Sequence, residues 1–189
     1  MRLIFERVDL SHHEPSVQSV IARVIHASAD LEYASTMVVS REAVEAGVAA
    51  LRNASPVVTD VEMVRHGLEG HAANCYLSQA NGNAELTRSA EGIRIAAERH
   101  PARAVVVVGC APTALHEVIE LARAGRFDPA LVIGLPVGFV GAAESKAALR
   151  TSGLAAITNV GHKGGSAVAA AVFNALARMA GGGGRDVDG

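Results

Sequence analysis

The chain has 189 residues, a length that suits one domain. Half of its residues are hydrophobic but only 3% are aromatic, so the core must be built from aliphatic side chains. A net charge of −2 without a basic run argues against a general nucleic-acid-binding protein. Two cysteines form no disulfide framework, the first ten residues do not resemble a signal peptide, and no apolar stretch reaches the roughly 18 residues of a membrane span. We therefore expect a cytoplasmic protein that binds neither nucleic acid nor membranes.

The first half of the chain predicts two helices followed by weaker elements. Apolar residues at helical spacing predict a helix over residues 16–33, with Pro15 near its start. Ser40 is expected to cap a second helix that ends near Arg52. The β-branched run 57–61 predicts a strand, residues 74–77 a weaker one, and residues 87–99 a helix.

The second half repeats a strand, a turn and a helix three times. Continuous apolar runs, typical of strands buried on both faces, occupy residues 104–108, 130–135 and 155–160. The helices that follow them are expected over residues 112–124, 140–150 and 166–179. This alternation predicts a mainly parallel sheet of about five strands in a three-layer α/β/α domain over residues 1–180. The glycine-rich tail 181–189 is predicted to be disordered.

Open parallel sheets bind ligands beyond the carboxyl ends of their strands, where this sequence has turns rich in glycine and proline. GHKGGSA, residues 161–167, combines backbone N–H groups, a helix start and Lys163, which favours an anion site, although a plain tight turn would also use these glycines. GLPVGF, residues 134–139, permits close approach of a ligand, and Phe139 either covers that ligand or belongs to the core. Nucleotide-binding fingerprints are missing, so no nucleotide cofactor is expected.

Three further side chains have both a structural and a chemical interpretation. Cys110, in the turn GCAPTAL, precedes a helix, which can lower the pKa of a thiol, but a small buried thiol is the simpler interpretation. Arg88 begins a helix, where a cation opposes the helix dipole unless it meets an anion. His26 lies on the polar face of the first helix, so it is a surface residue unless that face borders a cleft or another subunit.

Two groupings of polar residues predict no site. His66 and His71 have no further ligands for a zinc site, so no metal is expected. Asp60 and Glu62 are alternate residues, which point to opposite faces of a strand, so we do not interpret them as a catalytic pair.

Several segments, taken in order, resemble the precorrin-8X methylmutase (cobalt-precorrin-8 methylmutase) family. The likeness spans residues 26–179 and is most specific over residues 131–149. The segments are RVIHA around His26, SREAVEAGVAAL from Ser40, TDVEMVRHG from Thr59, TRSA from Thr87, GCAPTAL from Gly109, PALVIGLPVGFVGAAESKAAL from Pro129 and GHKGGSA from Gly161.

The resemblance implies a flavodoxin-like fold and a homodimer or higher homo-oligomer with sites near subunit contacts. It implies an isomerase of vitamin B12 biosynthesis that moves the C-11 methyl group of precorrin-8X, or of its cobalt counterpart, to C-12. The product is hydrogenobyrinate or cobyrinate, and this sigmatropic shift needs no cofactor. By position, His26 matches the catalytic histidine and Arg88 a substrate contact. The turns at the strand ends complete the expected substrate contacts, which are Gly109, Pro112, Thr113, Gly138, Phe139, Lys163, Gly164, Gly165 and Ser166.

The sequence departs from the family pattern at Cys110, where an Asn is usual, and at Ser28 and Ala29, where Cys-Gly is usual. Its N-terminus is short and residues 68–86 are compressed. Two other classes of protein fit the residues. One is a cysteine-dependent hydrolase using Cys110, which needs a nearby histidine; the other is a corrinoid-binding protein without activity.

Overall fold

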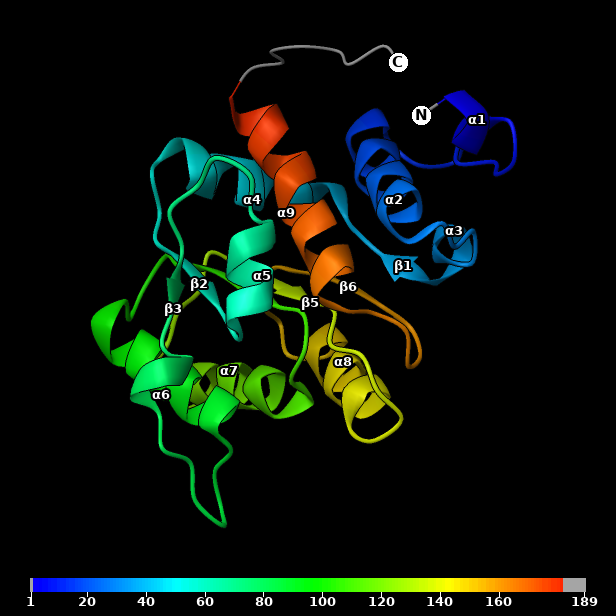
Figure 1. Cartoon of the computed structure of the whole chain (residues 1–189). Helices are drawn as coiled ribbons and strands as arrows, with labels where there is room; N and C mark the ends of the chain where they lie inside the picture. The colour runs from blue at the N-terminus through cyan, green and yellow to red at the C-terminus, as the bar shows by residue number, and fades with distance from the viewer. Residues whose placement is uncertain (1, 182–189) are drawn as a thin grey trace.

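The computed structural model describes residues 2–181 and shows a six-stranded sheet between two layers of helices (Figure 1). The strands follow the order β1-β6-β5-β4-β2-β3, and all neighbours are parallel except β1 and β6. Counted along the chain, the five parallel strands have the order 2-1-3-4-5, which is that of flavodoxin-like folds. The strands are β1 (Met37–Val38), β2 (Val57–Thr59), β3 (Asn74–Cys75), β4 (Val105–Val108), β5 (Leu131–Gly134) and β6 (Ala156–Asn159).

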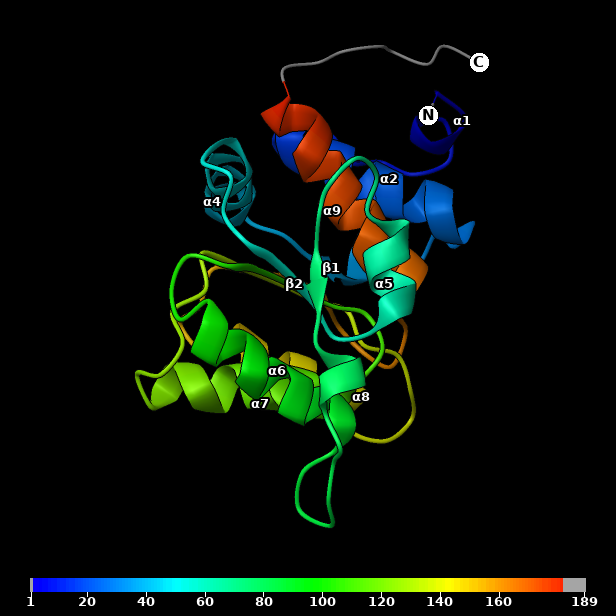
Figure 2. The same cartoon turned by 60° about the vertical axis from the view of Figure 1, so that its left-hand side comes forward.

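Helices cover both faces of this sheet, as Figures 1 and 2 show. The first face carries α2 (Pro15–Ser28), α4 (Arg41–Arg52), α5 (Glu62–Gly67) and α9 (Ser166–Ala180). The second carries α6 (Arg88–Arg99), α7 (Pro112–Arg123) and α8 (Ala142–Arg150). The three-layer α/β/α class and the mainly parallel sheet are therefore confirmed. Short elements complete the chain: α1 (Arg2–Phe5), α3 (Tyr33–Thr36) and the 3₁₀ helix η1 (Leu77–Gln79).

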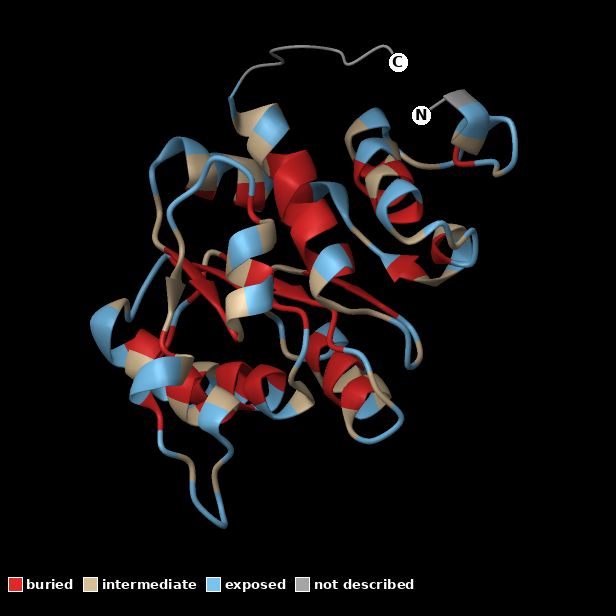
Figure 3. Cartoon of the chain, in the orientation of Figure 1, coloured by how far each residue is buried: buried red, intermediate tan, exposed pale blue. Residues whose placement is uncertain are grey.

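Helix α9 forms the centre of the larger core. Every residue from Val168 to Leu176 is buried, because α9 packs against the sheet on one side and against α2, α4 and α5 on the others (Figure 3). Its alanines at 169, 170, 171 and 175 allow the neighbouring helices to approach closely. Because α2 packs on α9, the buried stripe of α2 from Val17 to Ile25 faces inward and His26 is exposed, as its helical position predicts.

The predicted helix over residues 16–33 was too long, because α2 ends at Ser28. Ala29 has a left-handed backbone, with φ of 54°, and its N–H group donates to the Ile25 carbonyl oxygen at 2.8 Å. This conformation favours glycine, which is the usual residue here in the family pattern. The chain therefore makes the same turn with an alanine.

Other predicted boundaries were also wrong. The first predicted strand, residues 57–61, ends at Thr59, and the unpredicted helix α5 begins at Glu62. Strand β1 was not predicted, since two residues are too few to show an alternation of apolar and polar side chains.

Most of the tail predicted to be disordered, residues 182–189, lies outside the described residues. Within residues 2–181, no helix combines the length and apolar character needed to cross a membrane.

Candidate active site at the carboxyl edge of the sheet

The turn after β4 is closed by an internal carboxylate. Asp60 directly follows β2, and its Oδ1 accepts a hydrogen bond from the N–H group of Gly109 at 3.1 Å. Its Oδ2 accepts the N–H groups of Cys110 and Ala111, both at 2.8 Å. Burial raises the pKa of the Asp60 carboxyl, whereas the three N–H donors act to lower it. Flavodoxin-like folds bind ligands at this β2–β4 crevice, but here its amide donors are already used.

Gly109 itself is buried, and a Cβ atom there would lie 2.8 Å from the Val64 side chain. Packing therefore explains this glycine, and its surroundings give no support to the predicted substrate contact. Cys110 is exposed, and partial burial of its thiol, together with the charge of Asp60, raises the thiol pKa. Since a protonated thiol is a weak nucleophile, the structure does not favour a cysteine-dependent hydrolase.

The turns after β5 and β6 are joined to each other. Gly138 donates its N–H group to the His162 carbonyl oxygen at 3.1 Å, and Gly165 donates to the Leu135 carbonyl oxygen at 2.8 Å. A Cβ atom on Gly164 would lie 2.6 Å from the Pro136 carbonyl oxygen, so only glycine fits there. The close approach predicted for these glycines is therefore present, and it joins the two turns to one another.

The joined turns expose an apolar surface beside the start of α9. Phe139 is 89% exposed and Val140 is 88% exposed, so Phe139 does not belong to the core. The Phe139 ring lies 5.8 Å from the His162 ring, measured between centroids. Helix α9 begins after Gly165 with no side chain capping it, and Ser166 is its first residue. This region offers an exposed apolar contact beside a helix N-terminus.

Lys163 is held in a double ion pair. Its Nζ lies 2.6 Å from an Asp30 carboxylate oxygen and 2.8 Å from a Glu32 carboxylate oxygen. Hydrogen bonds to these two carboxylates raise the pKa of the Lys163 ammonium group. Asp30 follows His26 by four residues, so the pair connects the β6–α9 turn to the end of α2. Sequence reasoning missed both acids.

At the other end of this edge, Arg88 turns back onto the preceding loop. Its Nε donates to the Ala80 carbonyl oxygen at 3.2 Å, and its Nη2 donates to the Leu77 carbonyl oxygen at 3.1 Å. These acceptors offset its unfavourable position at a helix start. Three of its five guanidinium N–H groups make no hydrogen bond within residues 2–181. Thr87 caps α6, and its Oγ1 lies 2.7 Å from Oγ1 of Thr113 at the start of α7.

Contacts between neighbours thus connect most of the predicted site residues into one row, which we name the carboxyl-edge row. Gly141 lies against Pro112 and links α7 to the turn after β5. The row runs from Arg88 through Thr113, Pro112, Gly138, Phe139, Gly164, Gly165 and Ser166 to Lys163, and the ion pairs of Lys163 continue it to the end of α2, which carries His26.

A buried lysine that sequence reasoning missed supports this row. Lys146 has no exposed surface, and its Nζ donates to Asn159 Oδ1 at 2.9 Å and to the Lys163 carbonyl oxygen at 2.6 Å. Burial, and secondarily the charge of Arg150, lowers the pKa of Lys146 to about 8. The signal was present in the sequence, because Lys146 occupies the inward stripe of α8. That stripe is Ala142, Ser145, Lys146 and Leu149.

This pKa predicts a stability that rises with pH. Native Lys146 releases its proton near pH 8, while the unfolded chain keeps it to about 10.5, so between these values the unfolded state binds more protons. Relative to a Lys146→Met variant, the wild-type free energy of unfolding is expected to increase by about 2 kcal/mol between about pH 7.5 and about pH 10. Urea unfolding of both proteins measures this difference, and a pH-independent difference would contradict the assignment.

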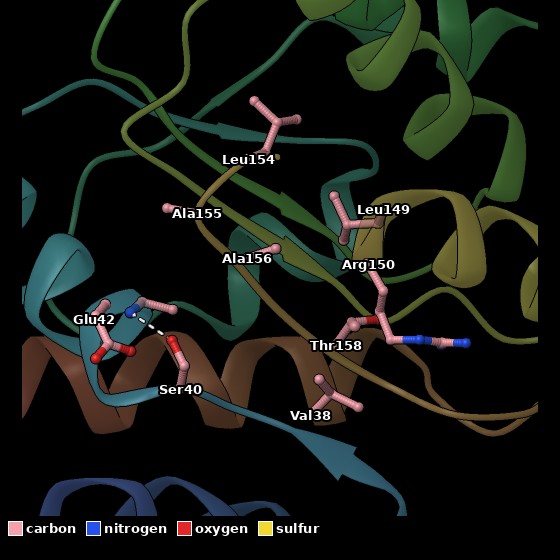
Figure 4. A pocket seen from close by; sticks show the side chains of 10 residues that line it. Val38, Ser40, Glu42, Leu149, Arg150, Leu154, Ala155, Ala156 and Thr158 are labelled. Atoms are coloured by element: carbon pink, nitrogen blue, oxygen red, sulfur yellow. Dashed lines mark hydrogen bonds between the residues drawn. The ribbon is translucent and has the colours of Figure 1, made fainter. Parts of the chain in front are cut away.

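A separate pocket of about 210 Å³ lies at the open edge of β6 (Figure 4). Strand β1 pairs only with Thr158 and Asn159, so the beginning of β6 is left uncovered between α4 and α8. Typical ligand clefts have volumes of about 300–1,000 Å³, so this pocket is smaller, and it contains none of the predicted site residues.

Within residues 2–181, no three His, Cys, Asp or Glu side chains are grouped to hold a metal ion.

Comparisons with known proteins agree with one family. The family model described as precorrin-8X methylmutase matches residues 1–179. A cobalt-precorrin-8 methylmutase of Methanothermobacter thermautotrophicus is 41% identical over 173 residues, covering 89% of this chain and 83% of its own. A precorrin-8X methylmutase of Pseudomonas aeruginosa is also 41% identical, over 85% of this chain and 83% of its own.

A solved structure of this family also has a similar fold. A solved structure of a precorrin-8X methylmutase from Thermus thermophilus is 34% identical, with a TM-score of 0.88, over 99% of this chain and 96% of its own. The chain therefore belongs to the precorrin-8X methylmutase family, whose members are isomerases that move a methyl group within one molecule.

Proposed function

We propose that this protein is a cytoplasmic isomerase that moves the C-11 methyl group of precorrin-8X, or of cobalt-precorrin-8, to C-12 of the same macrocycle. The bond from the methyl carbon to C-11 breaks as the bond to C-12 forms, so no atom or electron enters or leaves. The family match over residues 1–179 carries the proposal. One relative named cobalt-precorrin-8 methylmutase and one named precorrin-8X methylmutase are each 41% identical to the chain, so both substrates are included in the proposal.

His26 is the proposed catalytic residue. A migrating methyl group carries no charge, so the protein must act on the conjugated ring beside it. A histidine can hold or donate a proton near neutral pH, which allows it to polarise that ring through one hydrogen bond. The exposure of His26 on α2 leaves its imidazole accessible to a ligand.

The carboxyl-edge row supplies complementary contacts for a flat ring that is edged with carboxylates. Phe139 and Val140 present exposed apolar surface to a ring face. The first turn of α9, after Gly164 and Gly165, offers backbone N–H groups and the positive end of a helix dipole to a carboxylate. The remaining donors of Arg88 suit a second carboxylate.

A second copy of the chain is proposed to cover this row and to form a cleft with it. In a single copy of the chain, the large apolar side chains of Phe139 and Val140 are exposed at the row. Such exposure is typical of a surface that binds a ligand or a partner. Sedimentation of the protein with and without product tests this assembly. A monomer at micromolar concentration in both states would contradict it.

Incubation with precorrin-8X and, separately, with cobalt-precorrin-8 tests the reaction. Conversion of either compound, followed by its visible spectrum, is the expected result. Alkylation of the thiols before the assay should leave most of the activity, whereas a cysteine-dependent enzyme would lose it. A protein that binds the macrocycle tightly but leaves its spectrum unchanged would be a corrinoid-binding relative without activity.

Arg88→Ala is expected to weaken binding of the reaction product by about 1–3 kcal/mol, because a charge-assisted hydrogen bond to a carboxylate is lost. Calorimetric titration with hydrogenobyrinate measures the dissociation constant. Arg123→Ala is the matched control, since Arg123 is exposed at the far end of α7. An unchanged constant in Arg88→Ala would remove this residue from the site.

A further inference from the structure

We propose that Lys163 is a positioning residue, which holds the end of α2 that carries His26 through its ion pairs with Asp30 and Glu32. It then affects turnover through His26 and does not bind a substrate carboxylate itself. The inference rests on the role of His26 in the proposed function. It also reassigns the one lysine that sequence reasoning placed among the substrate contacts.

Two buried side chains donate hydrogen bonds that fix the main chain of Lys163. Its carbonyl oxygen accepts a hydrogen bond from Lys146 Nζ at 2.6 Å and another from Asn159 Nδ2 at 3.0 Å. Lys146 and Asn159 have no exposed surface, and they come from α8 and β6. The Lys163 side chain therefore starts from a point that is tied to the sheet and to α8.

The acidic side of the pair is tied to the last turns of α2. Asp30 Oδ2 contacts Lys163, while its Oδ1 accepts the N–H group of Glu32 at 3.0 Å. The N–H group of Asp30 donates to Ser28 Oγ at 3.2 Å, and that hydroxyl donates to the Val24 carbonyl oxygen at 2.9 Å. His26 lies within this bonded unit, residues 24–32. Movement of Asp30 and Glu32 would therefore move the histidine.

The charges at this point disfavour a substrate carboxylate. Two carboxylates face one ammonium group, so the group of three carries a net negative charge. An incoming carboxylate could reach only the third N–H group of the ammonium and would be repelled by both acids. The three side chains are 46%, 30% and 56% exposed for Lys163, Asp30 and Glu32, so the pairs contribute little to global stability.

A mutant cycle, in which kcat and KM of each variant are measured, tests the proposal. Lys163→Met, the double variant Asp30→Asn/Glu32→Gln and the combined triple variant are assayed with whichever macrocycle the wild type converts. We expect each to lower kcat about tenfold, with KM within about twofold, and the triple variant to be no worse than either. Lys163→Arg, which can still bridge both acids, should recover most of the turnover. If Lys163→Met raised KM about tenfold while the acid variant lowered KM, Lys163 would be a substrate ligand and the proposal would be overturned.

A second measurement is independent of activity. Amide hydrogen exchange of residues 26–32 is expected to accelerate about threefold in Lys163→Met and in the acid variant, with α6 unchanged as the internal control. Full activity in His26→Ala would refute the role of His26, while the exchange data would still show whether Lys163 orders this segment. An inactive His26→Ala beside wild-type kcat and exchange in Lys163→Met would refute the positioning role alone.

Discussion

Replacing His26 with alanine is expected to lower turnover by about 10²–10⁴-fold, the usual contribution of a positioned hydrogen-bond or acid–base group. Binding of the macrocycle should change little, because most of the proposed contacts lie along the carboxyl-edge row. The fold should survive, since His26 is exposed and lies outside the buried stripe of α2.

Single-turnover kinetics on His26→Ala, together with calorimetric titration of the product, separates these effects. His12→Ala is the matched control, because His12 is also exposed but precedes α2 at its opposite end. Turnover within a few-fold of wild type would remove His26 from the chemistry. Loss of the folded state in His26→Ala would instead make the residue structural.

Asp60→Ala is expected to destabilise the protein by about 3–4 kcal/mol. The variant removes the acceptor of three backbone N–H groups, at Gly109, Cys110 and Ala111, and leaves these N–H groups of a partly buried turn without it. Unsatisfied buried donors and lost bonds to a charged acceptor are among the costly consequences of a single substitution. The turn between β4 and α7 should therefore open before the rest of the sheet.

Urea unfolding at neutral pH measures the change in free energy. Asp128→Ala is the control, since Asp128 is exposed and its side chain accepts no comparable set of backbone bonds within residues 2–181. A loss below about 1 kcal/mol in Asp60→Ala would show that the carboxylate is not what holds the turn.

The regular part of the fold could be predicted because its signals are local. Four consecutive valines form β4, and Pro112 begins the helix that follows, so the βαβ pattern is visible in short windows of sequence. The elements that were missed lack such signals. Strand β1 has two residues, and the end of α2 depends on a left-handed alanine, a conformation that alanine rarely adopts.

The sequence was enough to place the glycine turns together at the carboxyl edge of the sheet, because parallel strands end at the same edge. The hydrogen-bond and ion-pair partners within these turns could not be predicted. The partners of Lys163 are 133 and 131 residues away in the chain. The donors to Asp60 are 49 to 51 residues away. Such pairings follow from the packing of α2 on α9 and from the strand order, and no local pattern encodes them.

The most direct test of the proposed reaction follows the methyl group itself. Precorrin-8X carrying ¹³C in its C-11 methyl group is incubated with the protein, and the position of the label in the product is read by NMR. We expect the label to appear in the methyl group at C-12, with no label lost to solvent or to another molecule. Recovery of the label at C-11 after prolonged incubation with both the metal-free and the cobalt-containing macrocycle would contradict the proposed reaction.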